Sequence, residues 1–429
     1  MSNQSILNVQ IHPAPPDTVA GKERREFLHR LSDHIDKNPF SDTTSAARFD
    51  AFEVLQYNWL NRGRGNRGTP FDATILVPKN LRAAPSYPVH VRFHGGDFCT
   101  GDPQYKPWFP PHAADLSLLC DAITIMPEYR KMPESGAEAI FDDVECFWGH
   151  FKQRAWELDD FLRWEGHNIS LYRDRVLVSG DGAGAMLAIR SWLWHQKASN
   201  IKALFLQSPL FEAPASDICQ YLKNDLEEDQ IIKAGEAAIQ SMEEMKRIAS
   251  EQSKDFGLHI RPSLTPPEGL LMASYLRITG KWKKLFLERP CEAITEYGHP
   301  DIMDRLQKKE GKLSDADPFI AIIHGGKDTF APPGHVNRFV DIVQGKTNGE
   351  REDKIVRKPF PNGGHGFDHD MSLEDLQLPD TTLNKIKKAW LGKSSSNEAA
   401  IIDGVAKLEV DSHLFESKGR DENVNLNTD

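Results

Sequence analysis

The chain has 429 residues, of which 39% are hydrophobic and 27% are charged, and its formal net charge is -11. These values are typical of a globular chain that is long enough to bury a large core. The acidic balance argues against general binding to nucleic acid or to an anionic membrane surface, because both require a basic face.

The five cysteines are far apart in the sequence and form no CxxC pair. This spacing favours reduced thiols over disulfides or a zinc site. The first residues lack the basic and apolar regions of a signal peptide, and no apolar run reaches the length of a membrane span. We therefore expect a cytoplasmic protein with no membrane span.

The first 60 residues are predicted to form a separate segment. Residues 1–20, rich in proline and polar side chains, are typical of a loose arm. Residues 21–60 have the apolar spacing of helices that could belong to a lid. The second of these helical patterns contains Phe49, Phe52 and Leu55. Residues 61–68 form a basic glycine loop, which we interpret as a solvated turn because no helix follows it.

Strands are predicted at 71–77 and 89–93, and the second strand leads directly into His94, Gly95 and Gly96. Glycine frees backbone N–H groups to point at a developing oxyanion, which a bulky residue would hinder. Gly95, Gly96 and the following residue, Asp97, are therefore candidates for an oxyanion hole. A simple glycine turn beside a buried histidine remains the alternative.

After a further predicted strand at 123–126, an apolar strand at 176–178 breaks at Gly180 and passes at once into a helical pattern. The turn reads Gly180-Asp181-Gly182-Ala183-Gly184. A sharp strand-to-helix turn needs glycine on both flanks, because the two backbones pass too close for side chains. This is the frame of the Gly-x-Ser-x-Gly nucleophile elbow, with glycine at the serine position. The N–H of Ala183 is a further candidate oxyanion donor.

A dinucleotide-binding turn is the rival interpretation of the same glycines. Gly180, Gly182 and Ala185 match the pattern Gly-x-Gly-x-x-Gly/Ala. That motif requires an acidic residue at the end of the next strand, whereas the strand at 201–206 is followed by Gln207. We therefore predict no nucleotide here, and we expect neither a cofactor nor a metal.

The second half of the chain begins with an insertion. Residues 213–316 are acidic and helical in pattern, which predicts a cap that covers the site and selects what enters it. A purely structural insertion is the alternative. An apolar strand beginning at Phe319 then runs into a Gly-Gly turn and Asp328. After a last strand from Ile355, a glycine-rich loop carries His365. Two weaker candidates for a catalytic histidine are His324 and His369.

Several of these motifs, in this order, resemble the hormone-sensitive-lipase-like branch of the α/β hydrolases. They are His94–Gly96, Tyr129–Glu134, Asp142–Val144, Asp174–Arg175 and Gly180–Gly184. The resemblance covers roughly residues 70–210 and 315–392. It implies an α/β-hydrolase fold, with a mostly parallel central sheet flanked by helices, and hydrolysis of a carboxylic ester or lactone by a Ser–Asp–His triad.

The resemblance also implies a domain organisation and a role for each site residue. The predicted segments are an N-terminal arm with lid helices (1–60), a core in two parts (61–212 and 317–393), a helical cap (213–316) and a disordered acidic tail (394–429). Asp328 and His365 take the acid and base positions, and Gly182 occupies the nucleophile position.

Gly182 has no side-chain atom that can attack a carbonyl, so an acyl-enzyme cannot form there. We therefore predict a serine-less enzyme in which a His365–Asp328 dyad acts as general base beside an oxyanion hole. Such a site suits lyase, isomerase or cyclisation chemistry, or direct attack by water. One alternative is a pseudohydrolase that binds a small ligand without catalysis. Another is a serine esterase or lipase in which the serine at 182 was changed to glycine by engineering.

The expected substrate or ligand is a small hydrophobic compound that contains a carbonyl group. Aromatic residues near the expected pocket mouth motivate this prediction: Phe98, Tyr105, Trp108, Phe109 and Phe367. The predicted binding residues are His94, Phe98 and Asp181. Asp97 departs from the family, which commonly has a third glycine there. Its carboxylate would oppose an oxyanion if it pointed inward and would orient the loop if it pointed outward.

Overall fold

The computed structural model describes residues 22, 43–61, 69–133, 135–211, 229, 231–233, 235–237, 239–240, 266–287, 302–308, 316–328, 330–345 and 354–392. The chain divides into a unit that ends at Trp390 and a second unit that begins at Leu391. The sheet and the candidate site both lie in the first unit.

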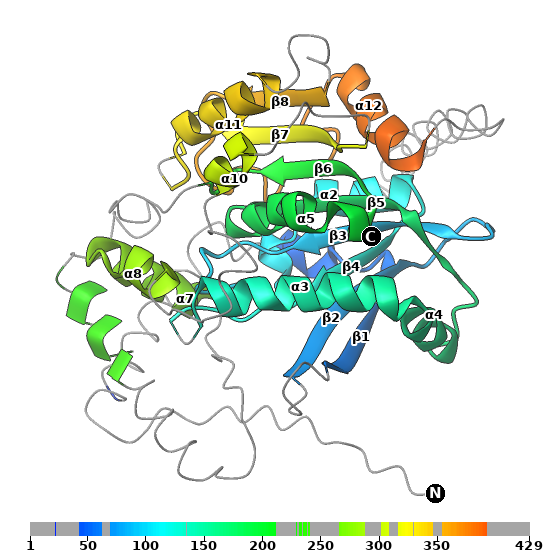
Figure 1. Cartoon of the computed structure of the whole chain (residues 1–429), viewed down its shortest axis with the longest axis horizontal. Helices are drawn as coiled ribbons and strands as arrows, with labels where there is room; N and C mark the ends of the chain where they lie inside the picture. The colour runs from blue at the N-terminus through cyan, green and yellow to red at the C-terminus, as the bar shows by residue number, and fades with distance from the viewer. Residues whose placement is uncertain are drawn as a thin grey trace, which may run out of the picture. The chain divides into compact units, whose positions relative to one another are not determined.

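An eight-stranded sheet forms the centre of the described part of the chain (Figure 1). Its strands are β1 (Phe52–Asn61), β2 (Thr69–Pro78), β3 (Tyr87–Phe93), β4 (Ile123–Pro127), β5 (Leu171–Asp181), β6 (Ile201–Gln207), β7 (Phe319–Gly325) and β8 (Ile355–Phe360). The spatial order is β1-β2-β4-β3-β5-β6-β7-β8. The pairs β1–β2 and β2–β4 are antiparallel, and the five remaining pairs are parallel. The predicted mostly parallel central sheet is confirmed.

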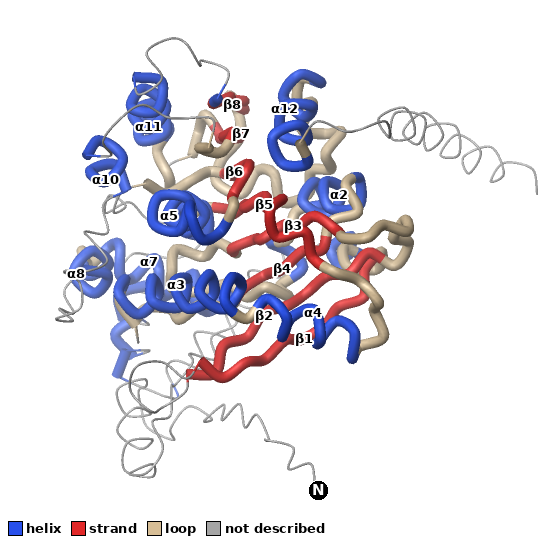
Figure 2. The backbone as a smooth tube through the Cα atoms, turned by 45° about the vertical axis from the view of Figure 1, so that its right-hand side comes forward, coloured by secondary structure: helices blue, strands red, loops and turns tan. Residues whose placement is uncertain are grey.

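Helices cover both faces of this sheet (Figure 2). On one face lie α3 (Ala137–Gln153), α5 (Ala183–Ser199) and α11 (Pro333–Gly345), and on the other lie α2 (Pro111–Leu119) and α12 (Asp380–Leu391). The other described helices are α4 (Ala155–Trp164), α7 (Pro266–Ile278), α8 (Lys281–Leu287) and α10 (Ile302–Lys308), with short 3-10 helices η2 (Thr43–Ala47) and η3 (Lys106–Trp108).

The two faces of the sheet are packed differently. Alternate residues of β3, such as Val89 and Val91, join a large hydrophobic cluster with α3 and α5. On the opposite face His90 forms hydrogen bonds with the hydroxyls of Ser117 in α2 (2.8 Å) and Ser179 in β5 (2.7 Å). Burial lowers the pKa of His90 to about 3, so this imidazole is neutral and acts as a structural link between α2 and the sheet.

The N-terminal edge of the sheet differs from the prediction. The spacing of Phe49, Phe52 and Leu55 predicted a helix, but the chain forms β1 from Phe52 and pairs with β2 along its whole length. Phe52 and Tyr57 point into the core, and Gln56 donates a hydrogen bond to Thr74 across the pair (3.0 Å). Cross-strand pairing therefore overrides the helical spacing. The sheet therefore begins within residues 1–60, which were predicted to form the arm and lid helices.

Parts of the predicted organisation lie outside the described residues. They are the arm up to residue 42 except Lys22, the basic glycine loop from 62 to 68, most of the segment 212–265, the segments 288–301 and 309–315 of the predicted cap, and the tail from 393. Within the described part of 213–316, α7, α8 and α10 are helical.

The loops that follow the strands bring distant parts of the sequence together. Strands β3, β5, β6, β7 and β8 are parallel neighbours, so their carboxyl ends lie at one edge of the sheet. Open α/β sheets bind ligands at this edge. The loop after β3 carries Gly96, that after β5 Gly182, that after β7 Asp328 and that after β8 His365.

Candidate active site

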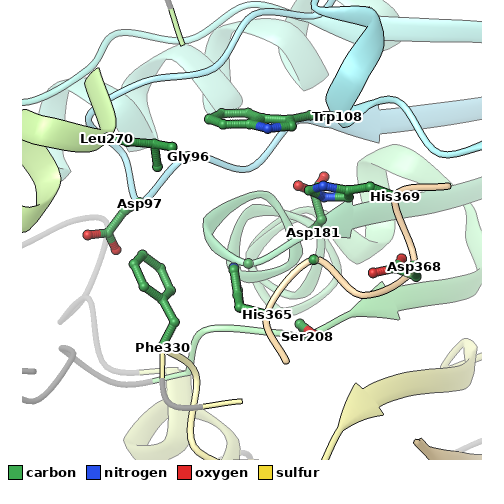
Figure 3. A pocket seen from close by; sticks show the side chains of 12 residues that line it. Gly96, Asp97, Trp108, Asp181, Ser208, Leu270, Phe330, His365, Asp368 and His369 are labelled. Atoms are coloured by element: carbon green, nitrogen blue, oxygen red, sulfur yellow. The ribbon is translucent and has the colours of Figure 1, made fainter. Parts of the chain in front are cut away.

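A pocket of about 40 Å³ lies at this edge of the sheet (Figure 3). It is lined by Gly96, Asp97, Trp108, Asp181, Gly182, Ser208, Leu270, Phe330, His365, Gly366, Asp368 and His369. A pocket of this volume holds roughly three water molecules. The pocket therefore brings together the candidate nucleophile position, the candidate base and the candidate oxyanion loop.

The turn between β5 and α5 has an unusual backbone conformation at Gly182. Its φ of 51° and ψ of -112° lie in a region that residues with a side chain rarely adopt. Two hydrogen bonds hold it there: its N–H donates to Gln207 O (2.9 Å), and its carbonyl accepts from Leu210 N (3.0 Å). A side chain at this position would cost about 1–3 kcal/mol of strain, which glycine avoids.

Close backbone approach explains the last glycine of the motif. A Cβ added to Gly184 would lie 2.2 Å from the carbonyl oxygen of Phe93, at the end of β3. Helix α5 can therefore pack against the end of β3 only because residue 184 has no side chain.

We expect Gly184→Ala to lower the free energy of unfolding by about 1–3 kcal/mol or more, because the added methyl group overlaps the Phe93 backbone. Urea unfolding measures this loss. Gly149→Ala in α3 is the matched control, since an added Cβ there meets nothing within 4 Å. It should be neutral or stabilising by about 0.5–1 kcal/mol. Equal stabilities of the two variants would contradict the close approach.

The candidate acid and base are in hydrogen-bond contact. Nδ1 of His365 lies 2.9 Å from Oδ2 of Asp328. The other carboxylate oxygen of Asp328 accepts hydrogen bonds from the N–H groups of Phe330 (2.9 Å) and Ala331 (2.8 Å), which fix its orientation. The opposite nitrogen of the imidazole, Nε2, would lie 3.3 Å from a Cβ on Gly182. His365 is thus oriented by Asp328 and faces the elbow.

The pKa values of this pair shift in opposite directions. Burial acts to lower the pKa of His365, but the charge of Asp328 and its hydrogen bond outweigh burial and raise the pKa above its usual value. Burial acts to raise the pKa of Asp328, but His365 and the Ala331 N–H outweigh it and lower the pKa. Asp328 is therefore ionised at neutral pH and stabilises the protonated form of His365.

Two of the predicted oxyanion donors, Gly96 and Asp97, line the pocket. The third, Ala183, is the first residue of α5, where N–H groups have no acceptor within the helix. The loop is closed by Cys99 N and Thr100 N, which both donate to Gly96 O (2.9 and 3.0 Å).

The Asp97 carboxylate is held by a cation. Arg277 of α7 donates to both of its oxygens, from Nε to Oδ2 and from Nη2 to Oδ1, each at 2.7 Å. The guanidinium opposes the increase in pKa that burial imposes on Asp97. The Asp97 carboxylate therefore points to α7, where the guanidinium of Arg277 balances its charge.

Residues 90–267 match a family model described as alpha/beta hydrolase fold. This match and the mostly parallel eight-stranded sheet identify an α/β-hydrolase fold, and this part of the chain is called the hydrolase domain below. The chain is 34% identical over 145 residues to a protein named probable carboxylesterase M8 from Phoma sp., a match that covers 33% of this chain and 44% of that protein. It is 33% identical over 104 residues to probable carboxylesterase clz11 from Cochliobolus lunatus, covering 24% and 46%. The matched part thus spans less than half the length of each relative.

Solved structures similar to the hydrolase domain include EstE1, a thermostable carboxylesterase cloned from a metagenomic library. Its TM-score is 0.49, with 16% identity over 87% of this chain and 98% of that one. A Staphylococcus aureus protein of unknown function has a TM-score of 0.47 at 16% identity, over 78% and 99%.

Of the three predicted binding residues of the hydrolase domain, one lines the pocket and two lie outside its lining. Asp181 lines the pocket and forms a buried ion pair with Arg92 (2.8 Å). His94 lies outside the lining, where its ring stacks on Tyr129 with 4.3 Å between ring centres. Phe98 is also outside the lining and fully buried in the hydrophobic core. Gly95, the remaining candidate of the oxyanion loop, lies against Asp181, and a Cβ there would overlap its carboxylate.

The predicted pocket aromatics are also divided. Trp108 lines the pocket, whereas Tyr105 packs edge-on against Trp108 outside the lining. Phe109 belongs to the small hydrophobic cluster that includes part of α2. Phe367 packs on Phe360 at the end of β8, with 4.6 Å between ring centres. Trp108 alone of these five residues belongs to the pocket lining.

The sequence analysis missed several residues that line the pocket, and it named His369 only as a weaker candidate for a catalytic histidine. Leu270 comes from α7, inside the predicted cap, and Phe330 follows Asp328. His369 lines the pocket, whereas His324 is buried outside the lining, with its Nε2 2.8 Å from Ala331 O. A helical pattern cannot show which helical turn will face a pocket, so Leu270 had no signal.

The loop that carries His365 is anchored to α2. His112 forms a buried hydrogen bond with Asp368, with 3.0 Å between Nε2 and Oδ2. The N–H of His112 donates to Met371 O (3.0 Å), and the N–H of Leu373 donates to Asp115 (2.8 Å). Three bonds therefore fix the loop just after the candidate base.

None of the described helices combines the length and the apolar character needed to cross a membrane.

Proposed function

We propose that the hydrolase domain is a serine-less enzyme that acts on a small hydrophobic carbonyl compound, with an ester as the substrate that its family relationship favours. In this proposal His365 and Asp328 form the general base, and the N–H groups of Gly96, Asp97 and Ala183 form the oxyanion hole. The observation that carries the proposal is the orientation of His365. One ring nitrogen is bonded to Asp328, and the other lies 3.3 Å from where the side chain of residue 182 would begin.

Water is the nucleophile that this geometry favours. The elbow position, which a serine hydroxyl fills in related enzymes, is within hydrogen-bond range of Nε2 for a water oxygen. Neutral His365 would take a proton from this water as its oxygen attacks the carbonyl carbon. The carbonyl oxygen becomes an oxyanion held by the backbone donors. The tetrahedral intermediate then expels the alkoxide, which takes the proton back from His365.

The lining supports a hydrophobic acyl group as the recognised part of the substrate. Trp108, Leu270 and Phe330 supply apolar surface around the pocket. On the other side, Asp181 and Asp368 are buried acidic groups. Both carboxylates already have partners, Arg92 for Asp181 and His112 for Asp368, so the apolar side of the pocket is the part that favours a hydrophobic acyl group.

We expect the native chain to release p-nitrophenol steadily from a short p-nitrophenyl ester, without an initial burst and without labelling by a serine-directed phosphonate. The rate should rise with pH through the pKa of His365, because only the neutral ring accepts a proton. Since Asp328 raises this pKa, the midpoint should lie above about 6.5. Spectrophotometric rates between pH 5 and 9 measure it.

His365→Ala is the control for this experiment, and it should lower the rate about 10²–10⁴-fold. Equal rates for the native chain and His365→Ala would show that the dyad does not act as a base. The non-catalytic binding interpretation would then be favoured. A second measurement, the entry of solvent deuterium next to the carbonyl of a ketone substrate, tests proton abstraction, and no deuterium entry would exclude that chemistry as well.

A further inference from the structure

The oxyanion loop has a backbone conformation that its own sequence does not favour. Three consecutive residues have positive φ: Gly96 at 108°, Asp97 at 55° and Phe98 at 59°. Glycine adopts such values freely, but aspartate does so uncommonly and a bulky aromatic residue rarely. Such conformations persist only where the surrounding structure holds them. The loop therefore needs contacts from outside itself.

Helices α7 and α8 supply polar contacts to the middle of this loop. Arg277 of α7 donates two hydrogen bonds of 2.7 Å to the carboxylate of Asp97, and the two side chains are only 1% and 0% exposed. Trp282 of α8 donates from its indole N–H to the carbonyl of the same Asp97 (3.2 Å). The side chain and the backbone of Asp97 are thus both held by these two helices.

Apolar contacts from the same helices hold the rest of the loop. The ring of Phe98 stacks on Phe286 of α8, with 5.0 Å between ring centres and 23° between the planes. A Cβ on Gly269 of α7 would lie 2.1 Å from the Cβ of Thr100, so α7 is seated directly on the end of the loop. The helix pair therefore touches the loop from Asp97 to Thr100.

Arg277 also contacts the other half of the site. Its guanidinium lies 3.4 Å from the ring centre of Phe330 and donates to Phe330 O (3.3 Å). Phe330 in turn packs on the ring of His365, with 4.5 Å between ring centres. One side chain of α7 thus links the oxyanion loop to the residues around the candidate base.

We propose that Arg277 is a positioning residue, through which the helix pair α7–α8 holds the oxyanion loop in its donor geometry. The role of the loop as an oxyanion hole rests on the proposed function, whereas the conformation of the loop does not depend on it. Without the guanidinium, Asp97 would be a buried carboxylate with no cation beside it, and the loop would leave its positive-φ conformation to hydrate it. The oxyanion hole is then complete only when α7–α8 is docked.

The first test is hydrogen–deuterium exchange of the amides at 95–100 in the full chain. Arg277→Met should raise their exchange rate by about tenfold or more. The double variant Asp97→Gly with Arg277→Met should return it close to the native rate, because glycine accepts a φ of 55° and leaves no buried carboxylate. Arg277→Lys keeps the charge but loses the paired hydrogen bonds, so it should give an intermediate rate.

Arg173→Met is the matched control, since Arg173 binds Asp159 through two hydrogen bonds (2.9 and 3.1 Å) near the start of β5. It should leave exchange at 95–100 unchanged. Unchanged exchange in Arg277→Met and Arg277→Lys, or no rescue in the double variant, would overturn the proposal. Should Arg277→Met fail to fold, Arg277→Lys and the double variant decide the question by the same readout.

The second test uses the chain with Gly182→Ser, in which ester turnover can be followed. Adding Arg277→Met should lower kcat about 10- to 100-fold with little change in KM, because oxyanion donors act on the transition state. Adding Asp97→Gly as well should restore most of kcat. A change in KM alone would overturn the positioning role. If Gly182→Ser has no activity, the oxyanion hole or His365 is not in working geometry, and exchange at 95–100 still decides whether Arg277 holds the loop.

Discussion

Gly182→Ser is expected to convert the hydrolase domain into a serine esterase. The new hydroxyl would lie next to Nε2 of His365, which is already oriented by Asp328. Hydrolysis of short activated esters should increase by about 10²–10⁴-fold over the native chain, since the hydroxyl is a positioned nucleophile with a base beside it. The variant should also be labelled by a serine-directed phosphonate, as intact mass measurement would show.

Two control variants separate the nucleophile from the shape of the elbow. Gly182→Ala adds the same Cβ and the same backbone strain but no hydroxyl, so it should be neither labelled nor more active. Adding His365→Ala to Gly182→Ser should remove nearly all of the gain, because the two residues act as a unit. Gly182→Ser should be less stable than the native chain by about 1 kcal/mol. A well-folded Gly182→Ser variant with neither label nor turnover would contradict the working geometry of the site.

Asp328→Asn is expected to have the second large effect. In the Gly182→Ser chain it should lower kcat by about 10³–10⁴-fold, because the amide cannot stabilise the imidazolium that forms during the reaction. It should also move the midpoint of the rising pH limb to lower pH. The reason is that the carboxylate raises the pKa of His365, so the pKa falls when the charge is removed. A pH–rate profile measures both effects.

His324→Gln is the control for Asp328→Asn. His324 lies 3.5 Å from the same carboxylate, and burial lowers its pKa to about 4, but it does not line the pocket. Glutamine retains an N–H that can donate to Ala331 O. This variant should keep most of the activity and the same pH midpoint. If it lost activity as Asp328→Asn does, His324 rather than His365 would be the partner of the acid.

The parts of the site that sequence could predict are those encoded by short local patterns. A sharp strand-to-helix turn is predicted by the glycines at 180, 182 and 184, because no other residue allows the two backbones to cross so closely. Asp328 and His365 each follow a predicted strand. Parallel strands end at one edge of a sheet, so two such residues can be expected to meet without knowledge of the loops between them.

The parts that could not be predicted depend on contacts between distant segments. Arg277 lies 180 positions from Asp97 in the sequence, on helix α7, whose own sequence pattern does not show which loop it packs against. The sequence therefore could not decide whether the carboxylate of Asp97 points into the site or away from it. The strand β1 was mistaken for a helix because its partner β2, and not its own spacing, determines its structure. Phe98 was placed at the pocket mouth, but its partner Phe286 holds it in the core.

The anchoring of the His365 loop to α2 has a consequence for the order in which this protein acquires its site. The contacts His112–Asp368 and Leu373–Asp115 join residues 256 and 258 positions apart. Contacts of such long sequence separation form late in folding, because a large loop must be closed first. During synthesis the ribosome must release nearly the whole of the first unit before the candidate base can be held. A nascent chain that stops at β7 would have its elbow and oxyanion loop but no base.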